Sequence, residues 1–363
     1  MTQNINVGRI FIKGIVIFLL VEFALLSSWP DISALNVYAL LRIKRERFPF
    51  STQAPADAAL DVGNLDAMFA SHIVSEPKKP NEYRIFILGD SSVWGIRMNT
   101  QQTLSEQINK LNLTCNNKFA KSYNLSFPLS SASKDLMILD KAMAYQPDLI
   151  IWFVTLNTLS PKARLNNILI AQNPVEFYQL GKQYNFLPRK YKPPTLLDYV
   201  SEKQRSLFHL FQYQAYSLVQ LATGKDQIQF PLAPTRPTEL SNNINFDGLR
   251  PPVLSLSNIS LDQIQDFYER AGNTPILLVN EPILIMNKIP NSDVRYNEYY
   301  PRWIYDQYRS YLADAASQNK WNYLDLWNFL SPDFFTNTPL HISPNGEYQL
   351  AKKLAPAIQK LCP

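Results

Sequence analysis

Short apolar runs alternate with helix-length segments from about residue 83 to the C-terminus. The runs are rich in β-branched and aromatic residues, and the segments between them place apolar residues at spacings of three and four. This alternation is typical of an α/β fold in which helices cover both faces of a parallel sheet. The predicted strands are 84–88, 122–126, 149–154, 276–280 and 322–327, and the predicted helices are 103–112, 133–145, 303–319 and 346–361.

One interval, residues 160–273, is too long for a simple crossover between strands. It is rich in Tyr, Phe, Gln and Pro, with a helical pattern over 202–222. We predict that residues 81–363 form one domain and that 160–273 is an insertion or cap over the edge of its sheet.

The N-terminal part of the chain has a different pattern. Residues 9–29 are mostly apolar and approach the ~20 residues that a membrane-spanning helix needs. We predict an uncleaved anchor over residues 1–30, because no small-x-small cleavage site follows the run cleanly; a cleaved signal peptide is the alternative. Residues 31–80 carry Pro, Ala, Ser and charges, and are predicted to form a stalk or linker.

The side of the membrane follows from two opposing signals. The basic segment 42–47 lies after the anchor and, counted naively, favours a cytoplasmic body. It begins more than ten residues past the apolar run, however, and a large domain after an N-terminal anchor usually lies on the far side. We therefore expect the body outside the cytoplasm.

A carboxylate lies near the middle of the predicted anchor. Glu22 is costly in hydrocarbon unless it is protonated, paired or facing another protein. Two interpretations stay open: Glu22 contacts a membrane partner, or the helix is short enough for this side chain to reach the interface.

Composition excludes some classes of function. The net charge of +5 is modest, and no long Lys/Arg run is interleaved with aromatic residues, so nucleic-acid binding is not indicated. No His/Cys cluster or glycine-rich phosphate loop is present, so we expect no metal or organic cofactor. Cys115 and Cys362 are candidates for a disulfide in an exported domain, and two unrelated thiols are the alternative.

Polar residues follow the predicted strands at the edge where an open parallel sheet binds its ligands. Gly89, Asp90 and Ser91 come directly after the first strand, and Asn157 follows the third. A histidine, His341, stands shortly before the last helix. The two other histidines of the chain, His72 in the predicted stalk and His209 in an apolar helical stretch, are interpreted as packing residues.

This set resembles the SGNH/GDSL hydrolase superfamily, whose four sequence blocks contain a Ser in a G-D-S turn, a Gly, an Asn and a late His. The resemblance covers about residues 83–361 and implies a flavodoxin-like three-layer sandwich with a mostly parallel five-stranded sheet. It makes Ser91 the nucleophile and His341 the general base. Asn157 and the backbone N–H of Ser91 would hold the oxyanion. The stretch "GDSSV" lacks the second Gly of a G-x-S-x-G elbow, which disfavours an α/β-hydrolase.

Two positions depart from the family pattern. The acid expected three residues before His341 is replaced by Thr338, with Asn337 just ahead of it. The imidazole would then be oriented by a backbone carbonyl, by Thr338 or Asn337, or by a carboxylate from elsewhere, of which Asp333 is nearest in sequence. The expected Gly of the second block is also absent. Leu129 and Ser130 stand in its place, so Ser130 is a weak third oxyanion donor.

The resemblance implies acyl transfer through an acyl-Ser91 intermediate. An exported domain of this type on one N-terminal helix is similar to the partners of multi-pass, membrane-bound O-acyltransferases. We therefore expect an esterase or O-acyltransferase that acts on O-acetyl or other O-acyl groups of a cell-surface or extracellular polysaccharide. The alternative is a catalytically inactive domain that binds glycan or scaffolds a membrane acyltransferase complex. A lipid or thioester esterase is a third, weaker hypothesis.

Overall fold

A computed structural model describes most of the folded body. It covers residues 8, 11–18, 20, 36–50, 65–184, 186–187, 191–223 and 236–362. Glu22 and most of the predicted anchor lie outside this range. Residues 11–18 are helical. No helix within the described ranges combines the length and the apolarity that crossing a bilayer requires.

The centre of the molecule is a six-stranded sheet with strand order β2-β3-β1-β4-β5-β6. The five longer strands pair in parallel, and β2 pairs antiparallel with β3. Without β2, the order is that of flavodoxin-like doubly wound folds. The strands are β1 (Glu82–Leu88), β2 (Thr114–Cys115), β3 (Lys118–Asn124), β4 (Leu149–Val154), β5 (Ile276–Asn280) and β6 (Asn322–Asp325).

The five predicted strands are confirmed, but the predicted five-stranded sheet has one strand too few. The missed strand, β2, contains two residues, which is too short for any hydrophobic period to show.

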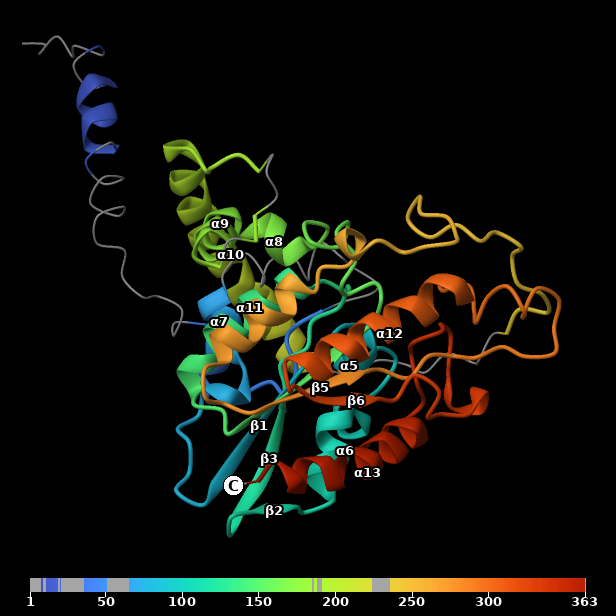
Figure 1. The fold of residues 1–363 in the computed structure, drawn as a ribbon. Coiled ribbons are helices and arrows are strands. Elements are labelled where there is room, and N and C mark those ends of the chain that lie inside the picture. The colour runs from blue at the N-terminus through green and yellow to red at the C-terminus, as the bar shows by residue number, and fades with distance from the viewer. Residues whose placement is uncertain are drawn as a thin grey trace, which may run out of the picture.

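Helices cover both faces of this sheet (Figure 1). Alternate side chains of β1 point to opposite faces, as in any strand. Phe86 and Leu88 pack in one core with α4, α7, α11 and α12, whereas Ile85 and Ile87 pack in the other with α6 and α13. These helices are α4 (Leu65–Ser71), α6 (Leu104–Lys110), α7 (Ala132–Ala142), α11 (Asp262–Ala271), α12 (Arg302–Gln318) and α13 (Pro344–Lys360). The predicted three-layer arrangement of the body is confirmed.

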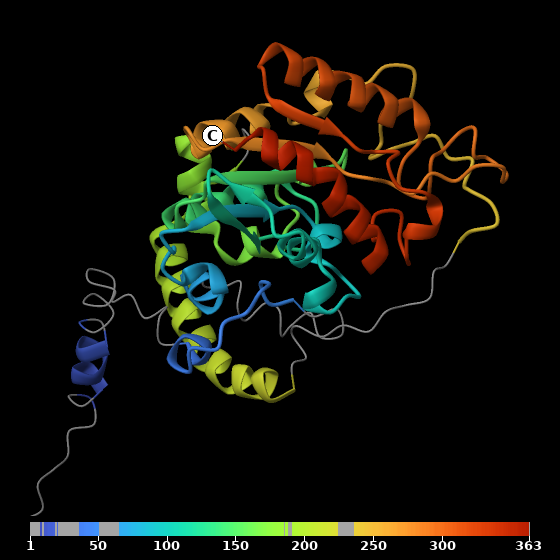
Figure 2. The same ribbon diagram turned by 90° about the horizontal axis from the view of Figure 1, so that it is seen from below.

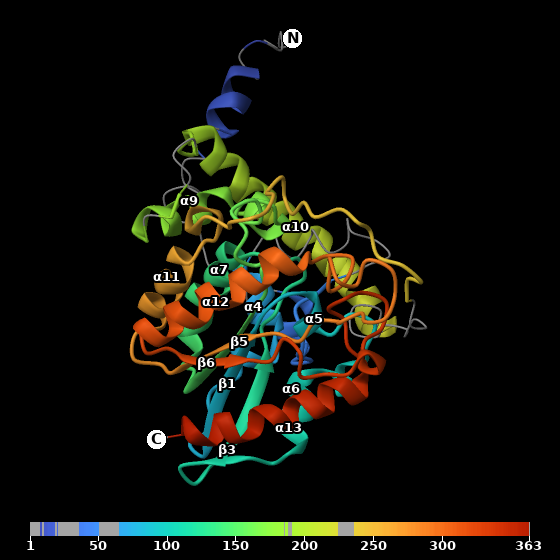
Figure 3. The same cartoon turned by 45° about the vertical axis from the view of Figure 1, so that its right-hand side comes forward.

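The remaining helices are shorter or belong to the insertion. Helices α8, α9 and α10 gather beyond α7 and α11, on the side away from the sheet (Figures 1 and 3). Within the predicted insertion, α11 is instead the crossover helix between β4 and β5, packed on the sheet. The bounds are α2 (Val37–Leu40), α5 (Ser91–Trp94), α8 (Ile168–Gln172), α9 (Pro174–Gln183), α10 (Leu196–Thr223), η2 (Ile73–Ser75), η3 (Thr100–Gln102), η4 (Met143–Tyr145), η5 (Leu256–Asn258) and η6 (Pro332–Phe334).

The segment predicted as a stalk contributes to the core, which corrects that prediction for residues 36–50 and 65–80. Phe48 and Phe69 are almost fully buried in the core that contains α7. The carbonyl of Phe48 accepts a hydrogen bond from the Trp94 indole at 2.8 Å. Arg47 donates to the carbonyl of Gly95 at 2.9 Å, and its guanidinium lies over the Trp94 ring. This segment therefore supports α5 from behind. In Figure 2 residues 36–50, in blue, lie beside α10.

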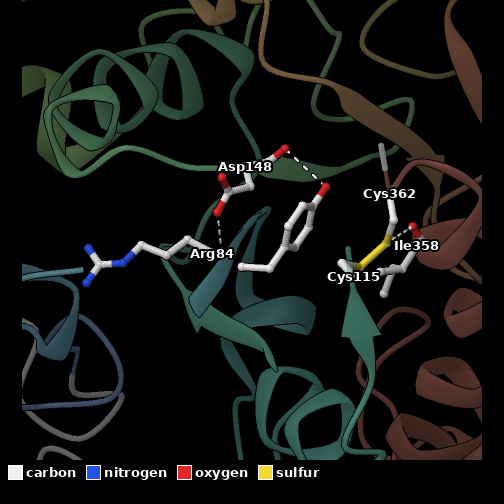
Figure 4. Close-up of a disulfide and its surroundings, with 6 residues drawn as sticks. Arg84, Cys115, Asp148, Ile358 and Cys362 are labelled. Atoms are coloured by element: carbon white, nitrogen blue, oxygen red, sulfur yellow. Dashed lines mark hydrogen bonds between the residues drawn. A yellow bond between two sulfur atoms is a disulfide. The ribbon is translucent and has the colours of Figure 1, made fainter. Parts of the chain in front are cut away.

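The structure joins Cys115 and Cys362 in a disulfide, so the alternative of two unrelated thiols does not hold (Figure 4). Cys115 ends β2, and Cys362 lies just after α13, where its sulfur also contacts the carbonyl of Ile358 at 3.2 Å. The bond attaches the last helix to the edge hairpin of the sheet. Because it closes a long loop, it restricts the unfolded chain strongly.

Candidate active site

Ser91 lies at a sharp turn between β1 and α5. The turn begins at Gly89, where a Cβ would lie 2.8 Å from Val93 Cγ2 and 3.2 Å from Phe153 Cβ. Only a glycine lets α5 fold back this closely against β4. Asp90 caps α5 by accepting a hydrogen bond from the backbone N–H of Ser92 at 2.9 Å. Ser91 is thereby held at the carboxyl end of β1, where the strand order reverses and ligands bind in folds of this type.

His341 reaches the same point from the other end of the chain. Its Nε2 lies 2.9 Å from Ser91 Oγ, although 250 residues separate the two. The histidine stands in the loop before α13 and is largely buried. A serine hydroxyl and an imidazole at this distance form a nucleophile and base pair.

The other ring nitrogen of His341 faces Asn337. Nδ1 lies 3.3 Å from Asn337 Oδ1, a long hydrogen bond in which Nδ1–H donates to the amide oxygen. In this tautomer Nε2 carries the lone pair that accepts the Ser91 proton. The Thr338 hydroxyl instead accepts the backbone N–H of His341 at 3.0 Å, so it shapes the loop and not the ring. Asp333, exposed in η6, makes no contact with the ring in the described part of the chain.

Asn157 and Ser130 line the same cavity as the nucleophile. Asn157 follows β4 and lines the same cavity as Ser91 and His341. Within the described residues its side-chain amide makes no hydrogen bond, which leaves it available to a ligand. The Ser130 hydroxyl donates to Asp90 Oδ2 at 2.5 Å and so ties the loop after β3 to the turn that carries Ser91.

Leu129, next to Ser130, has a backbone conformation that usually requires glycine. Leu129 has φ of 72°, in the left-handed region, and its side chain is 52% exposed at the cavity. That conformation costs a non-glycine residue about 1–2 kcal/mol. The missing Gly of the second block therefore leaves a strained leucine at the entrance to the site.

Burial sets the protonation state of the base. Removal from water lowers the pKa of His341; the Asp90 carboxylate opposes this shift and Arg97 adds to it. The imidazole is therefore neutral at pH 7, as a general base must be. Behind the turn, burial raises the pKa of Glu281 well above its ordinary value, with the Asp90 charge adding to the effect.

The cavity over Ser91 has a volume of about 420 Å³. It is lined by Ser91, His341 and Asn157, and by residues of the insertion, among them Lys162 and Asp247. Among the described residues, no group of three or more His, Cys, Asp or Glu side chains is arranged to hold a metal ion.

Comparisons with known proteins give structural likeness only. No family model matches the chain, and no curated protein matches it. Among solved structures, a carbohydrate acetylesterase family member from Sinorhizobium meliloti is 12% identical, with 77% of this chain and 98% of that chain covered at a TM-score of 0.36. A lipase/acylhydrolase from Enterococcus faecalis is 11% identical, with coverages of 76% and 95% and a TM-score of 0.36.

A third structure, the native aryl esterase of M. smegmatis, is 12% identical, with coverages of 77% and 99% and a TM-score of 0.33. All three are esterases or acylhydrolases by name. At such low TM-scores the likeness carries no argument by itself, so the chemistry rests on the geometry of Ser91, His341 and their neighbours.

Sequence reasoning missed one buried cation beneath the site. Lys134 is fully buried and donates to the carbonyls of Gly89 at 2.7 Å and Phe127 at 2.6 Å, and its charge is paired with Asp135. It thus connects the turn after β1 to the loop after β3. A signal was present, because a lysine in the first turn of a helix opposes the helix dipole and needs another reason to be there.

Replacing Asn337 tests which group orients the base. We expect Asn337→Asp to raise kcat/KM and to move the acid limb of the pH profile upward, because a carboxylate beside the ring stabilises the imidazolium. Asn337→Leu should lower kcat/KM by roughly tenfold or more, in the direction of the ~10⁴-fold loss that follows when a triad holds the wrong tautomer. The measurement is kcat/KM for an aryl acetate between pH 4 and 9.

Asp333→Asn is the matched control, since this acid is equally near in sequence but away from the ring. It should leave both the rate and the profile unchanged. A loss in Asp333→Asn as large as that in Asn337→Leu would show that the orienting group has been assigned wrongly.

Proposed function

We propose that the protein hydrolyses or transfers small O-acyl groups, acetyl foremost, on a cell-surface or extracellular polysaccharide. The observation that carries the proposal is the 2.9 Å contact between Ser91 Oγ and His341 Nε2, with Nδ1 of the same ring turned to Asn337. An imidazole held in this way has its basic nitrogen directed at the nucleophile.

The proposed reaction has two halves. Ser91 Oγ attacks the ester carbonyl carbon while His341 Nε2 accepts the hydroxyl proton, and the oxyanion forms beside the Ser91 N–H and the Asn157 amide. His341 then gives that proton to the departing alcohol oxygen, which leaves the acyl group on Ser91. Water, or a sugar hydroxyl, attacks the acyl carbon while His341 accepts its proton, and the proton finally returns to Ser91 Oγ.

The cavity supports a short acyl group and a polar alcohol. At about 420 Å³ it lies at the small end of ligand sites, and its walls include Ser130, Asn166 and Asp247. The aliphatic side chains that line it are Leu129, Ala163 and Leu340. Three such groups do not provide the continuous apolar surface that a long acyl chain would bury.

The location and partner in this proposal rest on the sequence. The apolar N-terminal run would hold the body at a membrane, and Glu22 would face a multi-pass O-acyltransferase that supplies or receives the acyl group. The disulfide between Cys115 and Cys362 supports an extracytoplasmic body, because such bonds persist in oxidising compartments.

Acyl-chain selectivity tests this function. With the full chain in detergent, we expect kcat/KM for p-nitrophenyl acetate to exceed that for p-nitrophenyl octanoate by about tenfold or more. The site has no apolar surface for the longer octanoyl chain, so its CH₂ groups stay in water and do not gain the ~0.8 kcal/mol that each buried CH₂ contributes. Protein carrying Ser91→Ala gives the background rate. Faster turnover of the octanoate would instead indicate a lipid esterase. No turnover of either ester by protein with a folded circular dichroism spectrum would favour the inactive, glycan-binding alternative.

A further inference from the structure

An exposed aromatic ring stands at the rim of the catalytic cavity. Tyr299, in the segment between β5 and α12, lines the cavity that holds Ser91 and His341. Its side chain is 39% exposed, whereas the neighbouring Tyr300 is fully buried. The reaction as described above makes no use of this ring.

Tyr299 is positioned by its backbone and by the neighbouring ring. Its backbone N–H donates to Asn297 Oδ1 at 2.9 Å, and its ring meets the edge of the Tyr300 ring at 90°. Thr338, whose hydroxyl accepts the backbone N–H of His341, lines the same cavity as Tyr299. The exposed ring therefore offers a ligand a flat aromatic surface at low entropic cost.

The insertion contributes polar groups in fixed positions to the same cavity. Lys162 Nζ donates to the backbone carbonyl of Asp247 at 2.5 Å, and the Ser160 hydroxyl donates to the Asp247 carboxylate at 2.8 Å. Asn166 is exposed and lines the same cavity. The cavity that holds the nucleophile thus combines an exposed aromatic ring with several fixed hydrogen-bond donors and acceptors.

We propose that Tyr299 is a specificity-determining residue, whose ring packs against the apolar face of a pyranose ring while Lys162, Asn166 and Asp247 bind its hydroxyls. A pyranose offers partners for both kinds of group, with C–H groups on its faces and hydroxyls at its edge. The inference rests on the proposed function, because it assumes that Ser91 accepts acyl groups from such a sugar.

The test compares mono-O-acetylated methyl pyranosides, as a panel of positional isomers, with ethyl acetate, which has no ring to pack. Hydrolysis is followed by acetate release from the full chain in detergent. The measured quantity is the ratio of kcat/KM for the best pyranoside to kcat/KM for ethyl acetate. We expect Tyr299→Ala to lower this ratio about fivefold to tenfold, and Tyr299→Trp to retain it.

The ratio of the two kcat/KM values distinguishes a role of Tyr299 in sugar specificity from a role in positioning His341. Any indirect disturbance of His341 by the substitution would slow both esters equally, which leaves the ratio unchanged. Tyr348→Ala is the matched control, because Tyr348 is 40% exposed on α13 but does not line the cavity. An unchanged ratio in Tyr299→Ala, or no preference of the wild type for any pyranoside over ethyl acetate, would overturn the inference. Failure of the wild type to hydrolyse ethyl acetate and every pyranoside would count against the proposed function itself.

Discussion

Replacing Ser91 by alanine is expected to lower kcat for an aryl acetate by about 10³-fold or more, because without Oγ no acyl-enzyme forms and only binding and the oxyanion donors remain. The fold should survive the change. The helix that carries Ser91 is held by the Asp90 cap, by Arg47 behind it and by Lys134 beneath it, and none of these contacts uses the Ser91 hydroxyl. Initial rates and the melting temperature, measured on the same sample, check both halves of this expectation.

The neighbouring serine provides the control. Ser92 is buried and is not among the residues that line the cavity. Ser92→Ala should therefore reduce activity far less than Ser91→Ala. If Ser92→Ala were inactive while Ser91→Ala retained turnover, the nucleophile would have been assigned to the wrong residue of the pair.

Loss of the base gives the second large effect. His341→Gln is expected to lower kcat by about 10³-fold or more, since glutamine cannot accept the Ser91 proton. The wild type should also show a single acid limb in its kcat/KM profile, with a midpoint below pH 6.5. Burial lowers the pKa of His341, and this shift outweighs the opposing effect of Asp90. The neutral base is therefore present above that pKa, and activity is lost as the pH falls through it.

The pH profile of His341→Gln shows whether the acid limb of kcat/KM reports the titration of His341. In His341→Gln the limb should vanish together with most of the rate. A wild-type midpoint above pH 7, or an unchanged limb in the variant, would show that another group controls the reaction. Circular dichroism at each pH separates titration of the base from acid unfolding.

The regular part of the fold could be predicted because its signals are local. The runs at 149–154 and 276–280 coincide with β4 and β5, since strands buried on both faces are continuously apolar. The predicted stalk failed for the opposite reason. Phe48 and Arg47 gain their structural role from Trp94 and Gly95, about 47 residues away, and no local pattern reports such contacts. Pro, Ala and charged residues around them gave the appearance of a linker.

Some residues of the candidate site could be predicted from the sequence, and others could not. Ser91, Asn157 and His341 follow strand ends or precede a helix, so their positions in the sequence place them at one edge of the sheet. The structure brings all three to one cavity. The choice among Thr338, Asn337 and Asp333 depends on the conformation of one irregular loop, which sequence spacing does not specify. Tyr299 also lies in an irregular segment, and only the tertiary structure shows that its ring reaches the cavity.

The most direct test of a reactive Ser91 is covalent labelling of the full-length protein with a fluorophosphonate, followed by intact mass and peptide mapping. We expect one adduct per chain, on Ser91. It should be absent in Ser91→Ala and should form about 10³-fold more slowly in His341→Gln. A folded wild-type protein that remains unlabelled, or an adduct mapped to a residue other than Ser91, would contradict this expectation.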